Sequence, residues 1–202
     1  MYLPKTPEIA KKIFPKLTWD NHQSDNSVYL SFDDGPSPEI TNWVLDQLER
    51  YDAKATFFCL GKNVVLYPEI FERILNNGHA VGNHTYNHLN CWQTDRKQYL
   101  SDIESCSRVF HSKFFRPPYG KLKPGVRSTI RKDYEIVMWD IMAYDFDQSV
   151  SPEDCARNVI EHVQPGSIIV FHDSLKAEKN LRKALPAVLE DFKRRGLQMK
   201  AL

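Results

Sequence analysis

Short apolar segments alternate with helical patterns along most of the chain, and this alternation constrains the fold more than any other feature. The apolar segments are rich in β-branched and aromatic residues and end at turn residues, as buried strands do. Between them, apolar residues recur at helical spacing, often after a Pro or before a Gly. We expect strands at 27–32, 55–60, 79–83, 135–139, 167–171 and 197–202, and helices at 37–50, 68–77, 94–110, 124–132, 151–164 and 178–194.

Strand–helix alternation of this kind predicts a parallel sheet covered by helices and closed, or partly closed, as a barrel. Polar clusters follow the expected strands: Asp33-Asp34, His84 to His88, Arg116 to Gly120, Asp145 and His172. The carboxyl ends of parallel strands share one face, which carries the active site in barrel enzymes. We therefore expect these clusters, far apart in sequence, to converge in space.

Bulk composition describes one ordinary globular domain. With 202 residues and 42% hydrophobic residues, the chain can bury a substantial core. A formal net charge of +1 gives no sign of a nucleic-acid partner. We assign residues 27–202 to the main domain and residues 1–26 to an N-terminal extension packed on it, and we expect a monomer without an obligate protein partner. The four cysteines are compatible with two disulfides or with free thiols in a reducing compartment.

The N-terminal region does not resemble an export signal, because lysines and prolines interrupt every apolar stretch. We expect a short helix packed on the domain, with a membrane-surface anchor as the less favoured alternative, since Ile9, Ile13 and Phe14 could form one apolar face. No segment approaches transmembrane length. These features predict a cytoplasmic protein, with membrane association as the alternative.

A metal site is the first chemical hypothesis. His84 and His88 are separated by four residues, which allows both imidazoles to reach one ion. Taken alone, such a pair is more often a surface feature than a metal site. Asp34 supplies a third ligand, and a set of three protein ligands leaves positions open for water, as in catalytic sites. We expect one divalent ion, zinc by default, with cobalt, nickel, iron or manganese as alternatives.

Two other clusters suggest hydrolysis. Arg116-Pro117-Pro118-Tyr119-Gly120 is stiff because prolines restrict the backbone. Such a segment can present a backbone N–H, for example that of Tyr119, to an oxyanion, although a plain loop is an equal alternative. His172 could act as a general acid for a leaving amine, with Asp145 or Asp173 orienting it, whereas a hydrogen-bonded core histidine is the commoner explanation.

In combination and order, these motifs resemble the polysaccharide deacetylase family, also called the NodB-homology domain or carbohydrate esterase family 4. The motifs are Phe32-Asp33-Asp34-Gly35-Pro36, His84-Thr85-Tyr86-Asn87-His88, Arg116-Pro117-Pro118-Tyr119-Gly120 and Val170-Phe171-His172. The resemblance covers about Tyr29 to Phe192 and implies a distorted (β/α) barrel with about seven parallel strands.

The resemblance also implies roles for individual residues. It makes Asp34, His84 and His88 the metal ligands, Asp33 the general base and His172 the general acid. Arg116 would hold Asp33, Asp145 would tune His172, Thr85 would steady the histidine loop, and the Tyr119 N–H would bind the oxyanion. Tyr119, Pro118, Phe146 and Val170 would contact the substrate.

The fourth family motif departs from its usual Asp-x-x-Asp-Trp pattern. Here it is Met142-Ala143-Tyr144-Asp145-Phe146, so that only Asp145 matches, and Asp140 or Asp147 could compensate for the missing acid. Val170 also replaces a common Leu. Phe146 and Val170 would still form an apolar pocket, of altered size, for the acetyl methyl group.

The leading functional hypothesis is metal-dependent removal of N-acetyl groups from amino sugars of a polysaccharide, a peptidoglycan-type glycan or a glycan precursor. One alternative keeps the same chemistry but changes the substrate to a small amide or an O-acetyl ester. Another is a homologue that binds glycan without turning it over, which the retained Asp33 and His172 disfavour. Exposed aromatic residues along an open groove would favour a sugar, whereas a closed pocket would favour a small molecule.

Overall fold

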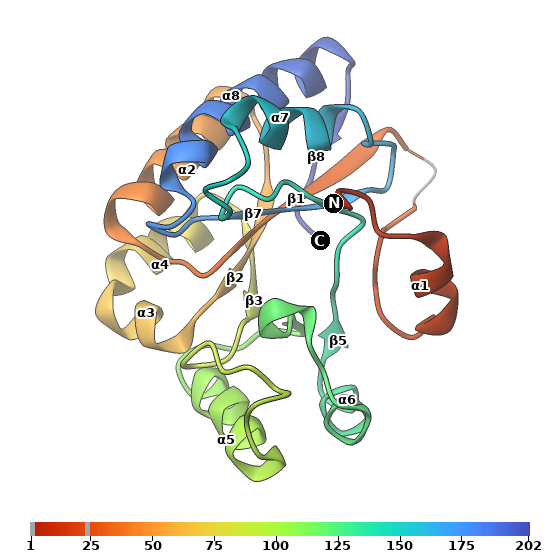
Figure 1. Cartoon of the computed structure of the whole chain (residues 1–202). Helices are drawn as coiled ribbons and strands as arrows, with labels where there is room; N and C mark the ends of the chain where they lie inside the picture. The colour runs from red at the N-terminus through yellow and green to blue at the C-terminus, as the bar shows by residue number, and fades with distance from the viewer. Residues whose placement is uncertain (1–2, 23–24) are drawn as a thin grey trace.

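A parallel sheet with β1 near its centre organises the molecule (Figure 1). The structure is a computed structural model that describes residues 3–22 and 25–202. Strand order is β5-β4-β3-β2-β1-β7-β6, and β8 pairs with the beginning of β1. All these pairings are parallel, which confirms the distorted, partly closed barrel. The strands are β1 (Ser27–Asp33), β2 (Ala55–Cys59), β3 (Ala80–Asn83), β4 (Phe114–Phe115), β5 (Glu135–Ile136), β6 (Ile141–Met142), β7 (Ile168–His172) and β8 (Gln198–Met199).

Helices connect the strands and cover the outside of the sheet. In Figure 1, α2, α7 and α8 lie above the sheet, whereas α5 and α6 lie below it. Proline at the first helical position, where no backbone N–H is needed, begins α2, α4, α6 and α7. The helices are α1 (Glu8–Ile13), α2 (Pro38–Arg50), α3 (Gly61–Leu66), α4 (Pro68–Asn76), α5 (Arg96–Ser107), α6 (Pro124–Ile130), α7 (Pro152–Ile160) and α8 (Glu178–Arg194), with a 3₁₀ turn, η1 (Pro118–Gly120).

Strand β1 is buried on both faces, and its two faces have different chemistry. Successive side chains of a strand point to opposite sides. Leu30 and Phe32 therefore enter the main apolar core beneath the helices. Ser31 and Asp33 point to the other side, where both bind Arg116. The alternation along β1 thus carries a polar site on the inner face of the sheet while the outer face remains apolar.

Several boundaries differ from the sequence prediction. The expected strand at 135–139 ends at Ile136, and the chain turns before a separate strand, β6, that was not predicted. Helix α3 was also missed, because it begins without a side-chain cap. The helix expected to be capped by Thr94 is capped by Asp95, whose carboxylate accepts hydrogen bonds from the backbone of Lys97 and Gln98. Short or uncapped elements give little periodic signal, which explains these errors.

The four cysteines are buried free thiols, which excludes the two-disulfide alternative in this fold. Cys59, Cys106 and Cys155 pack in the main apolar core, and Cys91 belongs to a second core cluster. Among the described residues, no helix combines the length and the apolar character needed to cross a membrane.

Candidate metal and catalytic site

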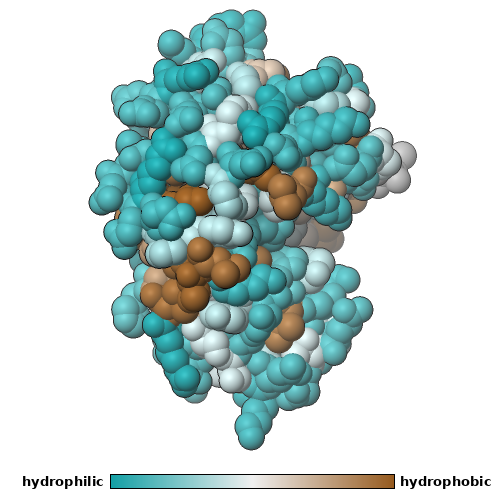
Figure 2. All heavy atoms as spheres, turned by 90° about the vertical axis from the view of Figure 1, so that its left-hand side faces the viewer, coloured by the Kyte–Doolittle hydropathy of each residue, from teal (hydrophilic) through white to brown (hydrophobic). Residues whose placement is uncertain are grey.

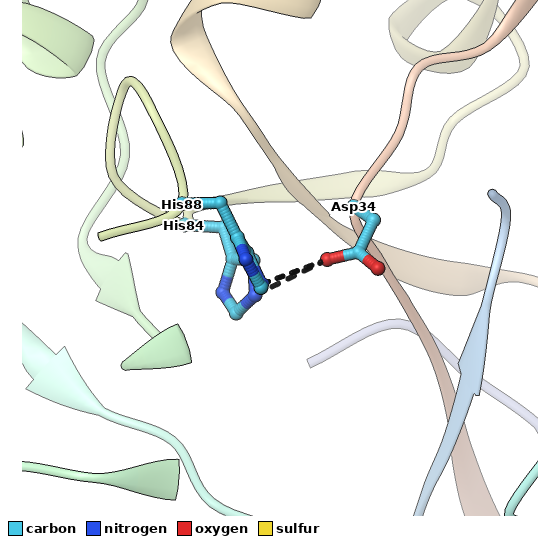
Figure 3. Close-up of side chains that lie close together, drawn as sticks. All are labelled: Asp34, His84 and His88. Atoms are coloured by element: carbon cyan, nitrogen blue, oxygen red, sulfur yellow. Dashed lines mark ion pairs between the residues drawn. The ribbon is translucent and has the colours of Figure 1, made fainter. Parts of the chain in front are cut away.

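Asp34, His84 and His88 come together at the carboxyl ends of β1 and β3 (Figure 3). Asp34 Oδ1 lies 3.1 Å from His88 Nε2 and 3.7 Å from His84 Nε2. The three candidate ligand atoms all lie within 4.8 Å of one another. Figure 3 shows both imidazoles pointing at the same carboxylate oxygen. The residues that sequence reasoning selected as metal ligands therefore form one compact cluster.

The protonation of His84 suits a metal ligand. Its Nδ1 lies 2.8 Å from the carbonyl oxygen of Arg116. Because a carbonyl only accepts, Nδ1 must carry the hydrogen, which leaves the lone pair of Nε2 facing Asp34. Burial lowers the pKa of His84 to about 4, against the opposing charges of Asp33 and Asp34. At neutral pH the imidazole is neutral, the form that binds metals.

Asp34 Oδ1 supports the same assignment. The atom is buried and, among the residues that the structure describes, has no hydrogen-bond partner, although His88 Nε2 lies 3.1 Å away. A buried carboxylate oxygen without a partner is costly. Burial raises the pKa of Asp34, but His88 and the charges of His172 and His84 outweigh it and lower the pKa below its usual range. An ionised oxygen facing two imidazole nitrogens fits a divalent cation.

The backbone of both ligand loops adopts left-handed conformations that other residues hold in place. Asp34, Thr85 and His88 have φ values of 82°, 68° and 63°. The Thr85 hydroxyl accepts a hydrogen bond from His88 N–H at 3.0 Å. Asp102 of α5 accepts the backbone N–H groups of Tyr86 and Asn87 at 3.0 and 2.9 Å. Sequence reasoning missed Asp102, because its role depends on a contact across the fold.

Asp33 is paired with a fully buried arginine. Arg116 donates to Asp33 Oδ1 at 2.7 Å and to the Ser31 hydroxyl at 2.8 Å. Its other nitrogens donate to the carbonyls of Val137 and Met138, at 3.2 and 2.9 Å. The guanidinium also lies 3.9 Å from the ring centre of Phe58. A planar group held from so many sides fixes the orientation of the Asp33 carboxylate.

His172 is held by Asp145, the one residue of the unusual fourth motif that matches the family. Asp145 accepts from His172 Nδ1 at 2.8 Å and from its backbone N–H at 2.7 Å. Burial lowers the pKa of His172, but the Asp145 carboxylate outweighs burial and raises it to about 9. The imidazole is therefore protonated at neutral pH, as a general acid requires.

The other acids considered for His172 have different partners. Asp173 is fully buried and points away, because consecutive residues of an extended segment face opposite sides. Its carboxylate accepts from Gly35 N–H at 3.0 Å and from the Thr41 hydroxyl at 2.5 Å. A Cβ on Gly35 would lie only 2.0 Å from Asp173 Oδ2. Asp173 thus supports the turn that carries Asp34, a role that sequence reasoning missed.

The two acids proposed as substitutes for the missing carboxylate bind residues other than His172. Asp140 is bound by Lys11 and by the Ser167 hydroxyl. Asp147 accepts from the backbone and the hydroxyl of Ser149. That one of them compensates for the missing acid stays a prediction.

Tyr119 lies in a strained turn beside the metal ligands. Its φ of 61° is left-handed, and its side chain is 59% exposed. The ring centre lies 4.7 Å from that of His88. Within the described part of the chain, the backbone N–H of Tyr119 has no hydrogen-bond acceptor. A free N–H in a rigid turn next to the candidate ligands is available to a substrate oxygen.

A cleft of about 1220 Å³ joins these groups. Asp33, Asp34 and His172 line it together with Tyr119 and with Trp139, which sequence reasoning did not select. Phe146 lies on the wall, and its ring centre is 4.8 Å from that of His172. Val170 and Pro118 are buried and are absent from the wall. The side of the molecule in Figure 2 shows hydrophobic patches within a largely hydrophilic surface.

Comparison with known proteins agrees with this geometry. Residues 20–136 match the family model described as polysaccharide deacetylase, which is more than half of the chain. The chain belongs to the polysaccharide deacetylase family. It is 32% identical over 193 residues to a peptidoglycan-N-acetylglucosamine deacetylase of Bacillus cereus, covering 86% of this chain and 70% of that protein.

Other members of the family extend the similarity. A chitooligosaccharide deacetylase of Azorhizobium caulinodans is 32% identical over 160 residues, covering 75% of each protein. The crystal structure of the peptidoglycan N-acetylglucosamine deacetylase Bc1960 superposes with a TM-score of 0.86 at 30% identity, covering 96% of this chain and 93% of that one. This polysaccharide deacetylase domain therefore shares its fold, over nearly its whole length, with a protein named as a peptidoglycan N-acetylglucosamine deacetylase.

Proposed function

We propose that the chain is a metal-dependent hydrolase that removes N-acetyl groups from amino sugars of a peptidoglycan-type glycan or a related polysaccharide. One observation carries the proposal: the ligand cluster, an arginine-held Asp33 and an Asp145-held His172 line one cleft. Asp34, His84 and His88 would hold the ion, with zinc as the expected metal. A divalent ion bound there would make water more acidic and polarise the acyl carbonyl.

The protein side chains would divide the proton transfers between them. Asp33 would accept a proton from the attacking water, and Arg116 would keep its carboxylate oriented. The backbone N–H of Tyr119 would donate to the oxygen that gains negative charge as water adds to the carbonyl carbon. His172 would then give its proton to the departing amine nitrogen, so that the C–N bond breaks to yield acetate and the free amino sugar.

The cleft favours a sugar over a small amide. Its volume of about 1220 Å³ exceeds what a small acyl compound needs. Tyr119 and Trp139 on its wall offer large apolar ring surfaces to a sugar ring. The relatives named above are deacetylases of peptidoglycan and of chitooligosaccharides. These points support an N-acetylated glycan as the substrate.

Acetate release is the direct test. Purified protein would be treated with a chelator and assayed with and without added zinc on peptidoglycan fragments, chitooligosaccharides, small acetamides and O-acetyl esters. We expect glycan deacetylation that disappears on chelation and returns with zinc. H84A should lose both bound metal and activity, whereas D33N should retain metal and lose about 10²–10⁴-fold in kcat.

His111, an exposed histidine outside the cleft, provides the matched control, and H111A should behave as wild type. Activity in metal-free H84A would contradict the proposed chemistry. Faster turnover of small acetamides or esters than of any glycan would assign the site to the alternative substrate class. Glycan binding without acetate release from any substrate would instead identify a binding protein.

A further inference from the structure

The N-terminal segment, residues 3–22, bridges the two edges of the incomplete barrel, and we call it the strap. The edge strands are β5 and β6. On the β5 side, Thr18 pairs with the continuation of that strand: its N–H donates to Ile136 O at 3.0 Å, and its carbonyl accepts Met138 N–H at 2.7 Å. On the β6 side, Pro4 O accepts Met142 N–H at 2.8 Å. The strap thus supplies the pairing that β5 and β6 lack.

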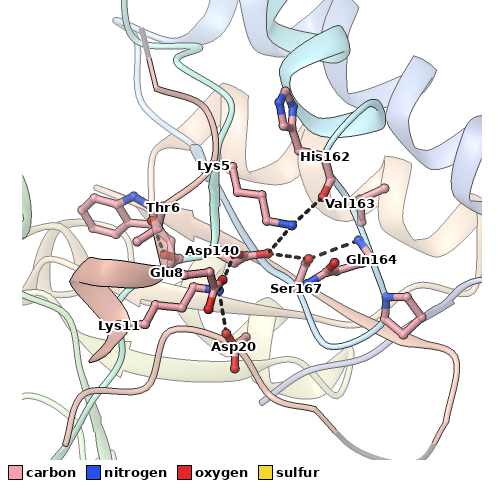
Figure 4. Close-up of polar contacts among 12 residues, drawn as sticks. Lys5, Thr6, Glu8, Lys11, Asp20, Asp140, His162, Val163, Gln164 and Ser167 are labelled. Atoms are coloured by element: carbon pink, nitrogen blue, oxygen red, sulfur yellow. Dashed lines mark hydrogen bonds and ion pairs between the residues drawn. The ribbon is translucent and has the colours of Figure 1, made fainter. Parts of the chain in front are cut away.

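A buried ion cluster fastens the strap to the barrel (Figure 4). Lys11 Nζ lies 2.8 Å from Asp140 Oδ1 and 2.8 Å from Asp20 Oδ2. The Asp140 side chain is fully buried, and that of Lys11 is 10% exposed. Burial lowers the pKa of Lys11, but the hydrogen bonds with Asp140, Asp20 and Glu8 outweigh it and raise the pKa. Without Lys11, the fully buried Asp140 side chain would keep only the Ser167 hydroxyl and Lys5, whose Nζ lies 4.0 Å away, as partners. Loss of the close partner of a buried charge is strongly destabilising, so this pair holds the strap firmly.

Between the edge strands lies the wall segment, residues 137–140, which the strap and the catalytic site hold from different directions. The carbonyls of Val137 and Met138 accept the Arg116 guanidinium that positions Asp33. The strap holds the same segment through the Thr6 hydroxyl, which donates to Trp139 O at 2.8 Å, and through Thr6 N–H, which donates to Asp140 O at 2.7 Å.

Trp139 links the wall segment to η1, the turn that carries Tyr119. Its side chain lines the cleft. A Cβ on Gly120 would lie 2.6 Å from the Trp139 ring, so that this ring packs directly against the turn that carries Tyr119. A shift of the wall segment would therefore move the carbonyls that accept from Arg116. It would also move the Trp139 ring, which lines the cleft and packs against η1.

We propose that the strap is a positioning element of the active site, and that Lys11 acts as a positioning residue by anchoring Asp140 and, through the wall segment, Arg116 and Trp139. The catalytic part of this inference rests on the proposed deacetylase function. Misplacement of catalytic groups by about 1 Å can cost about 100-fold in rate. Loosening the strap should accordingly lower kcat in protein that remains folded.

The test compares K11M with K12M, because Lys12 is exposed, adjacent and without an acidic partner among the described residues. T6V removes one hydroxyl from the strap and leaves all charges in place. Amide hydrogen exchange would be followed at Met138 and Met142, which donate to the strap, and at β2 as an internal reference. We expect faster exchange at Met138 and Met142 in K11M and T6V, with β2 and K12M unchanged.

Steady-state acetate release would be measured on the same samples, normalised to folded protein. We expect kcat in K11M to fall roughly 10- to 100-fold, with a smaller fall in T6V and partial rescue in K11R. If K11M does not fold, T6V and the neutral double variant K11M/D140N carry the test. Unchanged exchange at Met138 and Met142, or wild-type kcat despite faster exchange, would overturn the inference. If the wild type releases no acetate, the proposed function fails. The exchange data at Met138 and Met142 still test whether Lys11 and Thr6 hold the strap against the barrel.

Discussion

At the scale of single residues, Asp145 is the one acid of the fourth family motif that this chain retains, and it pairs with His172. Asp145 is fully buried and binds both the imidazole and the backbone of His172. Met142 and Phe146 line the cleft on either side of it in sequence. The departures from the family pattern therefore concern residues of the cleft wall. The hydrogen bond from His172 to Asp145, which favours the protonated imidazole, is retained.

D145N should move the basic limb of the pH–rate profile to lower pH. A general acid is active while protonated, so activity falls as pH rises through its pKa. Asp145 holds the pKa of His172 at about 9, and a neutral amide would lower that pKa. We also expect kcat at pH 8 to fall by about 100-fold or more, the usual contribution of a general acid. The measurement is kcat for acetate release between pH 6 and pH 10.

Asp147 provides the control, because its carboxylate binds Ser149 in the same loop. D147N should keep the wild-type profile. A basic limb that stays in place in D145N would show that His172 does not set it.

At the scale of elements, one carboxylate of α5 organises the loop that carries two candidate metal ligands. Asp102 accepts two backbone N–H groups and the side-chain amide of Asn87. The loop contains left-handed residues, Thr85 and His88, whose conformations are unfavourable unless the surroundings hold them. The helix therefore positions the loop with both histidines through bonds to Tyr86 and Asn87, which lie between them.

D102A should weaken both metal binding and folding. Removing the acceptor frees the loop, and loss of supporting contacts around a metal site commonly lowers affinity about 10- to 100-fold. Asp102 accepts three hydrogen bonds, and bonds to a charged group contribute about 1.5–3 kcal/mol each, so that we expect the free energy of unfolding to fall by about 3 kcal/mol or more. Zinc affinity by chelator competition and urea unfolding would measure the two effects.

Glu104, also on α5, forms an exposed ion pair with Arg108 and provides the matched control. E104A should change stability by less than about 1 kcal/mol and leave zinc affinity unchanged. Wild-type zinc affinity in D102A would contradict the positioning role of Asp102.

At the scale of the whole molecule, stability should depend on pH through a histidine that does not line the cleft. His79 is 7% exposed, and its Nδ1 accepts Ala55 N–H at 3.2 Å. Burial, with a smaller contribution from Lys54, lowers its pKa from 6.5 to about 4. Between these values the unfolded chain binds a proton that the folded chain does not, so stability is present above pH 6.5 and is lost as pH falls towards 4.

H79Q should therefore lose less stability on acidification than the wild type, by up to about 3 kcal/mol. Urea unfolding at pH 7.5 and pH 4.5, with chelator present so that metal release does not contribute, would measure the difference. H111Q, in which an exposed histidine is replaced, should retain the wild-type pH dependence. Equal acid sensitivity in H79Q and the wild type would exclude His79 as the cause.

The sequence by itself determined the class of fold, the succession of the main strands along the chain and the polar clusters at their ends. Strand β1 and helix α8 were predictable because periodicity and terminal residues are local signals. The family motifs selected Asp34, His84 and His88, which the fold brings within 4.8 Å through their ligand atoms. They also selected Asp33, Arg116, Asp145 and His172, whose pairwise contacts the structure supplies.

Only the tertiary structure decided which residues support that site. Asp102, Asp173 and Lys11 are ordinary charged residues in sequence, and each acquires its role from a partner on a different element. The two-residue strand β6, which the sequence did not predict, likewise depends on the hydrogen bonds that β7 and the strap offer it. Local patterns specify elements, whereas contacts between distant segments depend on how those elements pack, and the support of the candidate site consists of such contacts.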